Sequence, residues 1–223
     1  MRVVSLVPSV TETLLDWHVD VIACTRFCEQ PDIPHVGGTK DPDITAIVAL
    51  GPDIVVVDTE ENRRPDHDAL IEAGLTVVVT AVRSLADVDV ALGLLASAVG
   101  LSVPAPVAPV ELAPVTGNAF VPIWRRPWMS VNADTYVADI LRAAGFVSVF
   151  AAHCDRYPTV TEQEILAAAP DRVLAPTEPY AFGDRHLPEL ERFAPTTIVD
   201  GKDVTWWGAR TPIRLARLRS ALR

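Results

Sequence analysis

The chain carries one pattern twice, and this repeat constrains its fold more than any other feature. Ile47-x4-Pro52-Asp53-x-Val55-x3-Thr59-Glu60 recurs as Ile165-x4-Pro170-Asp171-x-Val173-x3-Thr177-Glu178, at a constant offset of 118 residues. In each copy a short apolar helix leads into Pro-Asp and a strand. The repeat predicts two similar lobes; the alternative is chance similarity of two strand starts, because Pro-Asp before a strand is common. Open α/β sheets bind ligands at the carboxyl ends of their strands, so we expect a ligand cleft between the lobes.

Strand and helix patterns alternate along the chain, which is typical of an α/β fold with mostly parallel sheets. We expect two Rossmann-like lobes, over residues 1–100 and 118–223. The segment 101–117 contains Pro104, Pro106, Pro109 and Pro114. Because proline cannot continue a helix, we expect a stiff, extended linker there.

The apolar periodicity and the turn residues predict the individual elements. Expected strands are 2–7, 19–24, 54–57, 75–80, 119–123, 172–175 and 197–199, and expected helices are 9–17, 44–50, 65–73, 84–99, 133–144, 162–169, 187–193 and one from residue 212. Ser9 and Glu12 have the spacing of a capping box. Asn132, Asp134 and Thr135 are expected to cap the helix that follows them.

Composition excludes some partners. A net charge of −10 argues against nucleic acid, whose phosphates are bound by clustered Lys and Arg. The sequence contains no run of about 18 apolar residues, so we expect no membrane span. The amino terminus reads as a strand and a helix start rather than a signal peptide, and three cysteines favour a reducing compartment. We therefore expect a cytoplasmic protein; the alternative is an exported protein of which this chain is a mature or truncated form.

The sequence resembles the helical-backbone (class III) periplasmic binding proteins over nearly its whole length. The resemblance is carried by Arg2-Val3-Val4-Ser5-Leu6-Val7-Pro8-Ser9-Val10-Thr11-Glu12, by Val36-Gly37-Gly38-Thr39-Lys40 with Pro42, and by Leu50-Gly51-Pro52-Asp53-Ile54-Val55 with its second copy. A narrower likeness to soluble cobalamin-binding-type proteins rests on Thr25-Arg26-Phe27-Cys28, Glu60-Glu61-Asn62-Arg63, Ile123-Trp124-Arg125-Arg126-Pro127 and Trp206-Trp207-Gly208-x-Arg210.

This resemblance implies a binding protein of the ABC-transporter type rather than an enzyme. Its ligand would be a corrinoid, haem, ferric siderophore or other metal-chelate held without a covalent bond, and its partner an ABC permease. Glu60 and Glu178 would then dock on permease arginines or line the mouth of the cleft. The chain departs from the family in two ways, since the helix at 84–99 is shorter than the usual connecting helix and no export signal is present.

Aromatic and arginine side chains are the leading candidates for ligand contact. Large aromatic faces cover flat ligands, and guanidinium groups pair with carboxylates or phosphates. The alternatives are that the tryptophans pack between the lobes, and that the arginines pair with Glu60, Glu61 and Glu178. At the first helix, Ser9 either offers amide donors to an anion or is a cap. The candidate ligand-binding residues are Pro8, Ser9, Arg26, Phe27, Glu60, Glu61, Asn62, Arg63, Trp124, Arg125, Glu178, Tyr180, Trp206, Trp207 and Arg210; Trp128 follows the same logic.

The rival hypothesis is a cytoplasmic metal-binding protein or enzyme built on the same scaffold. Cys28, His153 and Cys154 are candidate ligands that would have to converge from separate segments. The alternative interpretation is that the histidines, which also include His35, His67 and His186, are ordinary surface residues and that the cysteines are small buried residues. No nucleophile elbow, phosphate loop or HExxH motif indicates an enzyme. A third hypothesis, a regulatory interaction module, is supported only by the acidic composition.

Overall fold

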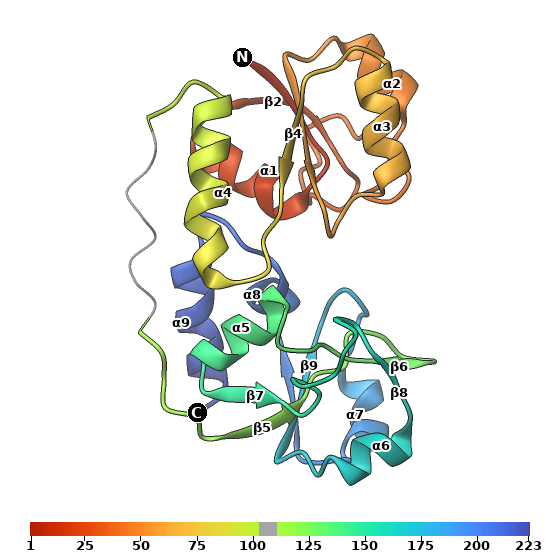
Figure 1. Ribbon diagram of the computed structural model, residues 1–223, viewed down its shortest axis with the longest axis vertical. Coiled ribbons are helices and arrows are strands. Elements are labelled where there is room, and N and C mark those ends of the chain that lie inside the picture. The colour runs from red at the N-terminus through yellow and green to blue at the C-terminus, as the bar shows by residue number, and fades with distance from the viewer. Residues whose placement is uncertain (103–110) are drawn as a thin grey trace. The chain divides into compact units, whose positions relative to one another are not determined.

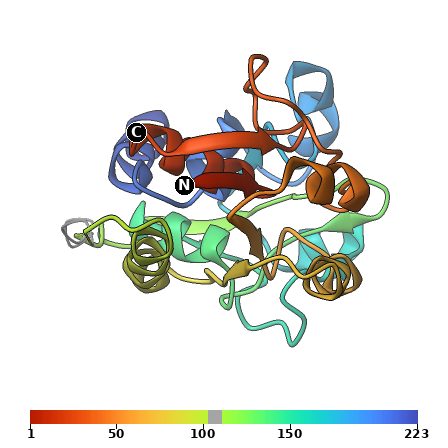
Figure 2. The same cartoon turned by 90° about the horizontal axis from the view of Figure 1, so that it is seen from above.

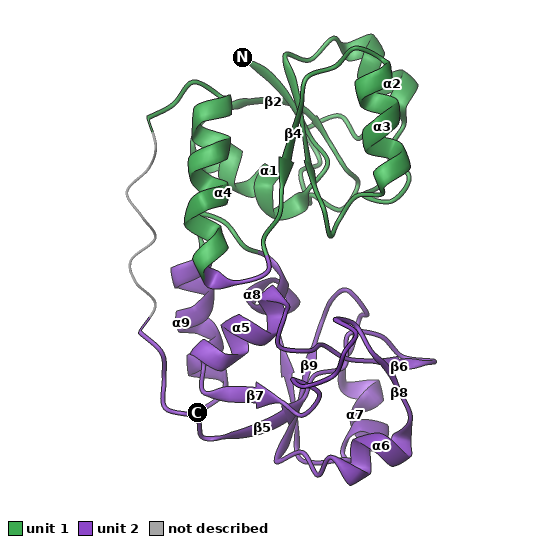
Figure 3. Cartoon of the chain, viewed as in Figure 1, with its two compact units in different colours: residues 1–82, 86–106, 207–210 green, residues 83–85, 107–206, 211–223 purple. Residues whose placement is uncertain are grey.

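The computed structural model describes residues 1–102 and 111–223, which form two compact units (Figure 3). Unit 1 comprises Met1–Val82, Ala86–Pro106 and Trp207–Arg210, and unit 2 comprises Arg83–Leu85, Val107–Trp206 and Thr211–Arg223. The sequence suggested a single boundary in the proline-rich segment 101–117. Residues 103–110 of that segment, with Pro104, Pro106 and Pro109, lie outside the described residues. In the described part of the chain, no helix has the length and apolar character needed to cross a membrane.

Unit 1 is built on a parallel sheet with strand order β2-β1-β3-β4. Its strands are β1 (Arg2–Ser5), β2 (Asp20–Cys24), β3 (Ile54–Asp58) and β4 (Val77–Thr80), and its helices are α1 (Pro8–Asp16), α2 (Ile44–Leu50), α3 (Arg64–Glu72) and α4 (Leu85–Ala98), whose first residue belongs to unit 2. Figures 1 and 2 show α1 and α4 on one side of this sheet and α2 and α3 on the other.

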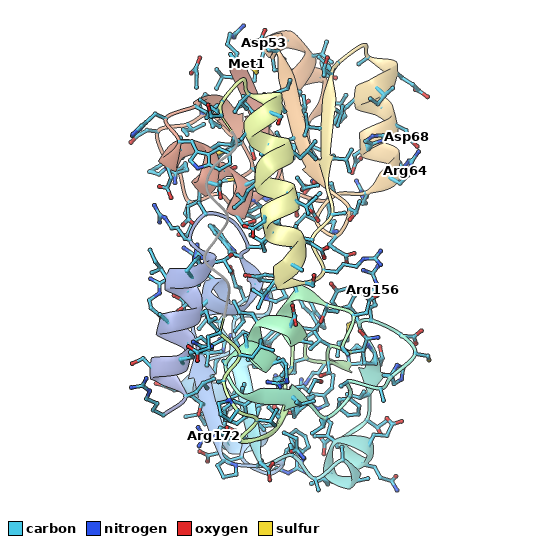
Figure 4. All side chains as sticks on the ribbon, turned by 60° about the vertical axis from the view of Figure 1, so that its left-hand side comes forward. Met1, Asp53, Arg64, Asp68, Arg156 and Arg172 are labelled. Carbon is cyan, nitrogen blue, oxygen red and sulfur yellow. The ribbon has the colours of Figure 1, made fainter. Side chains whose placement is uncertain are left out.

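Valine-rich strands make the core of unit 1, because both faces of the sheet are covered. Val4, Val55 and Val57 share a buried cluster with Ile47 of α2 and Leu70 of α3. At the start of β3, the Asp53 carboxylate accepts a hydrogen bond from the Arg2 amide at 2.7 Å. Figure 4 accordingly shows Asp53 close to Met1.

Unit 2 repeats this plan with strand order β10-β9-β5-β7, again parallel. The strands are β5 (Gly117–Phe120), β7 (Phe146–Ser148), β9 (Arg172–Pro176) and β10 (Thr196–Val199), with a separate antiparallel pair of β6 (Trp128–Met129) and β8 (Thr159–Val160). The helices are α5 (Tyr136–Ala143), α6 (Glu162–Ala167), α7 (Leu187–Leu190), α8 (Gly201–Thr205) and α9 (Thr211–Ala221), and a 3-10 turn η1 (Asp184–His186) precedes α7. Phe120 and Val173 pack against Ile165 of α6 and Leu190 of α7.

The repeat seen in the sequence is confirmed residue by residue. Helices α2 and α6 begin at residues 44 and 162, and strands β3 and β9 span 54–58 and 172–176, so both pairs keep the offset of 118. The N-cap residues correspond as well: the Asp43 side chain accepts from the Ala46 amide, and the Thr161 side chain accepts from the Glu164 amide. Each copy is therefore the same structural unit, and the predicted α/β fold with mostly parallel sheets is correct.

Some predicted element ends were wrong for local reasons. Helix α1 begins at Pro8 and has Val7 at its N-cap without a side-chain hydrogen bond, so the predicted Ser9 capping box is absent. Proline is favoured at the first helical position because it has no amide hydrogen to satisfy. The strand expected at 119–123 ends at Phe120 instead, ahead of Pro122, which cannot donate to the ladder. Strands β6, β7 and β8 and helix α8 were missed because they are short. Thr135 caps α5 as expected.

Candidate functional site

Asn62 braces the carboxyl edge of the unit 1 sheet. Its side-chain oxygen accepts from the Asp58 amide at 2.8 Å, and its side-chain nitrogen donates to the carbonyls of Leu6 at 3.2 Å and Thr39 at 2.9 Å. The Asn62 side chain thereby ties the ends of β1 and β3 to the loop before α2. This candidate ligand residue already has a structural role at the edge.

Asp58, the last residue of β3, is a buried carboxylate that sequence reasoning missed. It accepts hydrogen bonds from the Glu60 amide at 2.8 Å and from the Thr80 hydroxyl at 2.8 Å. Burial raises the pKa of Asp58 despite these bonds. The repeat gave no signal for Asp58, since the corresponding residue of the second copy is Pro176. Of the neighbouring candidates, Glu60 is half-buried and Glu61 is exposed.

Phe27 and Arg26 form an exposed pair in the loop that follows β2. The Phe27 side chain is 51% exposed, and the Arg26 guanidinium lies 4.9 Å from the centre of its ring. Arg26 also forms an ion pair with Asp41 at 2.9 Å. Gly38 makes this arrangement possible, because a Cβ at that position would lie 2.7 Å from an Arg26 nitrogen. Unit 1 therefore presents an exposed aromatic ring with a guanidinium over one of its faces.

Cys28, a weak metal candidate, is a buried and hydrogen-bonded thiol. Its sulfur lies 3.2 Å from the Thr25 hydroxyl and 3.3 Å from the Thr11 hydroxyl. The hydrogen bond with Cys24 lowers the pKa of Cys28 to about 6, although burial acts in the opposite direction. The same bond raises the pKa of Cys24. Both sulfurs are thus engaged inside unit 1.

An exposed Trp124 and a half-buried Tyr180 form an aromatic pair at the carboxyl edge of the unit 2 sheet. Trp124 follows β5, is 44% exposed and meets the Tyr180 ring edge-to-face at 5.5 Å. Tyr180 follows β9, and its ring lies 4.6 Å from that of Phe182. His186 lies next to Tyr180. Burial is the main cause that lowers the pKa of His186, and the charges of Arg185 and Arg125 add to it, which favours a neutral ring. Sequence reasoning found Trp124 and Tyr180 but not the Phe182 and His186 support.

The four candidate arginines all form ion pairs within their own units. Arg125 Nε donates to Glu189 at 2.7 Å, and Arg63 pairs with Asp66 at 2.9 Å. Arg210 binds both Glu12 at 3.0 Å and Asp16 at 2.7 Å, which holds the loop 207–210 against α1. Arg26, as described above, pairs with Asp41. These partners differ from Glu60, Glu61 and Glu178, the glutamates considered from the sequence. The arginines are therefore fixed in place, with their charges partly balanced.

The other candidate tryptophans and the two candidates in the first turn of α1 are buried. Trp206 and Trp207 follow α8 rather than a strand and are 9% and 6% exposed, so the expectation that they sit open in loops was wrong. Trp206 packs under the charged groups of Lys202 and Arg214. Trp128 is buried in the core. Pro8 and Ser9 are buried in the first turn of α1, where the Ser9 carbonyl accepts from Thr13.

Glu178, the counterpart of Glu60 in the repeat, is half-buried beside α8. Its carboxylate accepts from the Thr205 hydroxyl at 3.1 Å. Gly201 lets it approach so closely that a Cβ there would lie 2.2 Å from the Glu178 Cγ. The permease-docking role considered for Glu60 and Glu178 stays a prediction, as does the ligand cleft expected between the lobes.

Solved structures of periplasmic and ABC-transporter substrate-binding proteins are among the matches to this chain. The vitamin B12 binding protein BtuF of Vibrio cholerae matches with a TM-score of 0.80 over 99% of this chain and 96% of that chain, at 15% identity. The haem-binding protein RhuT from Roseiflexus sp. RS-1 gives 0.78 over 99% and 97%, at 19% identity. An ABC transporter substrate-binding protein from Listeria monocytogenes gives 0.73 over 99% and 97%, at 14% identity. No protein-family model and no curated protein matches the sequence.

These matches correct one expectation and support another. The cytoplasmic location expected from the amino terminus is contradicted, because the matched proteins BtuF and RhuT are periplasmic. The pattern of the amino-terminal residues was therefore not informative about location. The matched proteins are solute-binding proteins rather than enzymes, in line with the expectation of a binding protein. The chain therefore has the two-lobe α/β fold of the helical-backbone periplasmic binding proteins, the family that its sequence resembles.

Proposed function

We propose that this chain is a substrate-binding protein of the ABC-transporter type that holds a corrinoid or haem without a covalent bond. The observation that carries the proposal is the exposure of one large aromatic side chain at the carboxyl edge of each sheet. Phe27 is 51% exposed in unit 1 and Trp124 is 44% exposed in unit 2. Parallel α/β sheets bind their ligands at this edge.

The chemistry at both edges suits a flat, apolar ligand with anionic groups at its rim. Stacking against aromatic rings removes apolar ligand surface from water, which contributes about 25 cal/mol for each Å² buried. Arg26 lies on Phe27, and Arg125 follows Trp124 in the chain. A propionate or phosphate group near either ring would meet a guanidinium whose position is already held by Asp41 or Glu189.

The known ligands and locations of the matched proteins support the same proposal. BtuF binds vitamin B12 and RhuT binds haem, both in the periplasm, and the Listeria protein serves an ABC transporter. We infer that this chain acts outside the cytoplasm and delivers its ligand to an ABC permease. Fractionation of the source cells, followed by immunoblotting, tests the location.

Titration with candidate ligands tests the binding function. Purified protein is titrated separately with cyanocobalamin, cobinamide and haemin while tryptophan fluorescence and ligand absorbance are recorded. Saturable binding of one macrocycle is expected, and it identifies the ligand class. Saturation by none of the three overturns the proposal.

Variants then test the aromatic contacts. Phe27→Ala and Trp124→Ala each remove about 100 Å² of contact, so each is expected to weaken binding by about 2.5 kcal/mol, or roughly 60-fold. Ile71→Ala and Leu166→Ala are matched controls, because these side chains are 48% and 52% exposed on helices α3 and α6. Unchanged affinity in both aromatic variants, or equal losses in the controls, contradicts the assigned contacts.

A further inference from the structure

Three consecutive residues in the loop after β7 bring different metal-ligating atoms together. An imidazole nitrogen of His153, the Cys154 sulfur and a carboxylate oxygen of Asp155 all lie within 4.8 Å of one another. The sulfur is 3.9 Å from His153 Nδ1. Within residues 1–102 and 111–223, this is the group of three such residues that meets that distance limit. We propose that this loop binds a borderline divalent cation such as Zn²⁺, independently of any macrocycle.

The donor set favours this class of ion. Zn²⁺ and its first-row neighbours combine nitrogen, sulfur and carboxylate ligands, whereas Mg²⁺ and Ca²⁺ prefer oxygen alone. Ligands around a tetrahedral Zn²⁺ at about 2.0–2.3 Å lie roughly 3.3–3.8 Å apart. The 3.9 Å between His153 and Cys154 is close to that spacing, so a small movement of Asp155 completes the set. Three protein ligands leave a fourth position for water or for another ligand.

Hydrogen bonds hold the loop in place before any ion binds. The Asn132 side chain donates to the His153 carbonyl at 3.0 Å, and the Asn132 amide donates to the Arg156 carbonyl at 2.9 Å. The Ala133 amide donates to the Ala151 carbonyl at 3.0 Å. Because the backbone on both sides of Cys154 is anchored to residues 132–133, little chain ordering opposes binding.

The His153 ring is in the tautomer that binding through Nδ1 requires. The Asp155 amide donates to His153 Nδ1 at 3.0 Å, so this nitrogen carries the lone pair and the neutral ring carries its hydrogen on Nε2. A metal ion at Nδ1 replaces that hydrogen bond and frees the Asp155 backbone to turn its carboxylate inward. The thiol of the exposed Cys154 loses its proton on binding.

The experiment measures metal binding with no macrocycle present, so its outcome is separate from that of the proposed function. Chelator-treated protein is titrated with Zn²⁺ by calorimetry, and with Co²⁺ while absorbance is recorded. One ion is expected to bind per chain, and Co²⁺ is expected to give a thiolate-to-cobalt charge-transfer band. Cys154→Ser and His153→Ala are expected to weaken binding by about 100-fold or more, since loss of even an outer-shell partner costs roughly 10–100-fold.

Matched variants identify nonspecific binding. His67 and Asp68 form another histidine–carboxylate pair at 2.8 Å on α3, without a cysteine, and Figure 4 shows Asp68 on that helix. His67→Ala is expected to leave affinity and stoichiometry unchanged. Asp155→Asn keeps the size of the side chain and is expected to weaken binding. The proposal is overturned if Zn²⁺ does not saturate a site, if Cys154→Ser binds as tightly as the parent, or if the cobalt band survives in Cys154→Ser.

Discussion

Asp53 and Asp171 make the same hydrogen bond in the two units. The Asp53 carboxylate accepts from the Arg2 amide at 2.7 Å, and the Asp171 carboxylate accepts from the Asn118 amide at 2.8 Å. Each aspartate stands just before a central strand and ties it to the neighbouring strand. The Pro-Asp of the repeat thus serves to pair two strands. This structural role explains why both copies contain it, and it requires no role of the aspartate in ligand binding.

We expect Asp53→Ala and Asp171→Ala to lower the free energy of unfolding by about 1 kcal/mol each, the net value of one hydrogen bond. Urea unfolding followed by circular dichroism measures this change. Glu191→Ala, which alters an exposed residue of unit 2, is the control and is expected to have little effect. An equal loss in Glu191→Ala would show that the strand-start bond is unimportant.

Trp207→Ala is expected to destabilise the protein, in contrast to Trp124→Ala. Trp207 is 6% exposed whereas Trp124 is 44% exposed. Loss of a buried tryptophan side chain typically lowers the free energy of unfolding by about 3–5 kcal/mol. Thermal unfolding of both variants tests the difference. A stable Trp207→Ala protein with impaired ligand binding would instead support the ligand contact expected from the sequence.

Asp58→Asn is expected to stabilise the protein near neutral pH. Burial raises the folded-state pKa of Asp58 above its unfolded value. The stability that Asp58 contributes is therefore fully present below the ordinary aspartate pKa of about 3.9 and is lost as pH rises through the folded-state pKa. Asparagine removes the buried charge and keeps an acceptor for the Glu60 amide. The gain over the parent is expected to shrink toward about pH 4.

Asp68→Asn provides a control of opposite sign for that experiment. The hydrogen bond from His67 lowers the pKa of Asp68, so its contribution is present at higher pH and is lost as pH falls through the folded-state pKa. Unfolding curves of both variants at several pH values test this. If the Asp58→Asn gain does not depend on pH, the buried charge is not its cause.

Iodoacetamide is expected to alkylate Cys154 before the other two cysteines. The lowered pKa of Cys28 favours its thiolate, but Cys28 is only 2% exposed and Cys24 is fully buried, whereas Cys154 is exposed. Access therefore limits the reaction more than ionisation does. Peptide mass spectrometry of native and urea-unfolded protein measures the order. Native labelling of Cys28 as fast as Cys154 would mean that the region around β2 opens readily.

The sequence alone determined the two-lobe α/β fold, the repeat and most helices and strands. These features follow from local patterns: the valine-rich runs of β3 and β4, the glycine stops at Gly74 and Gly145, and the Pro-Asp before β3 and β9. The exposed aromatic candidates Phe27 and Trp124 could also be named, since each belongs to a loop after a strand.

The tertiary structure alone decided which candidates are buried and which charges pair. Arg210 forms a hydrogen bond with Asp16, which is 194 residues away in the sequence, and Asn62 forms one with Leu6, which is 56 residues away. No local sequence pattern predicts contacts at such separations. The burial of Trp206 and Trp207 likewise depends on packing, because a tryptophan after a short helix has the same sequence pattern whether it is exposed or covered. Local propensity sets the elements, but contacts between residues distant in sequence set the environment of each side chain.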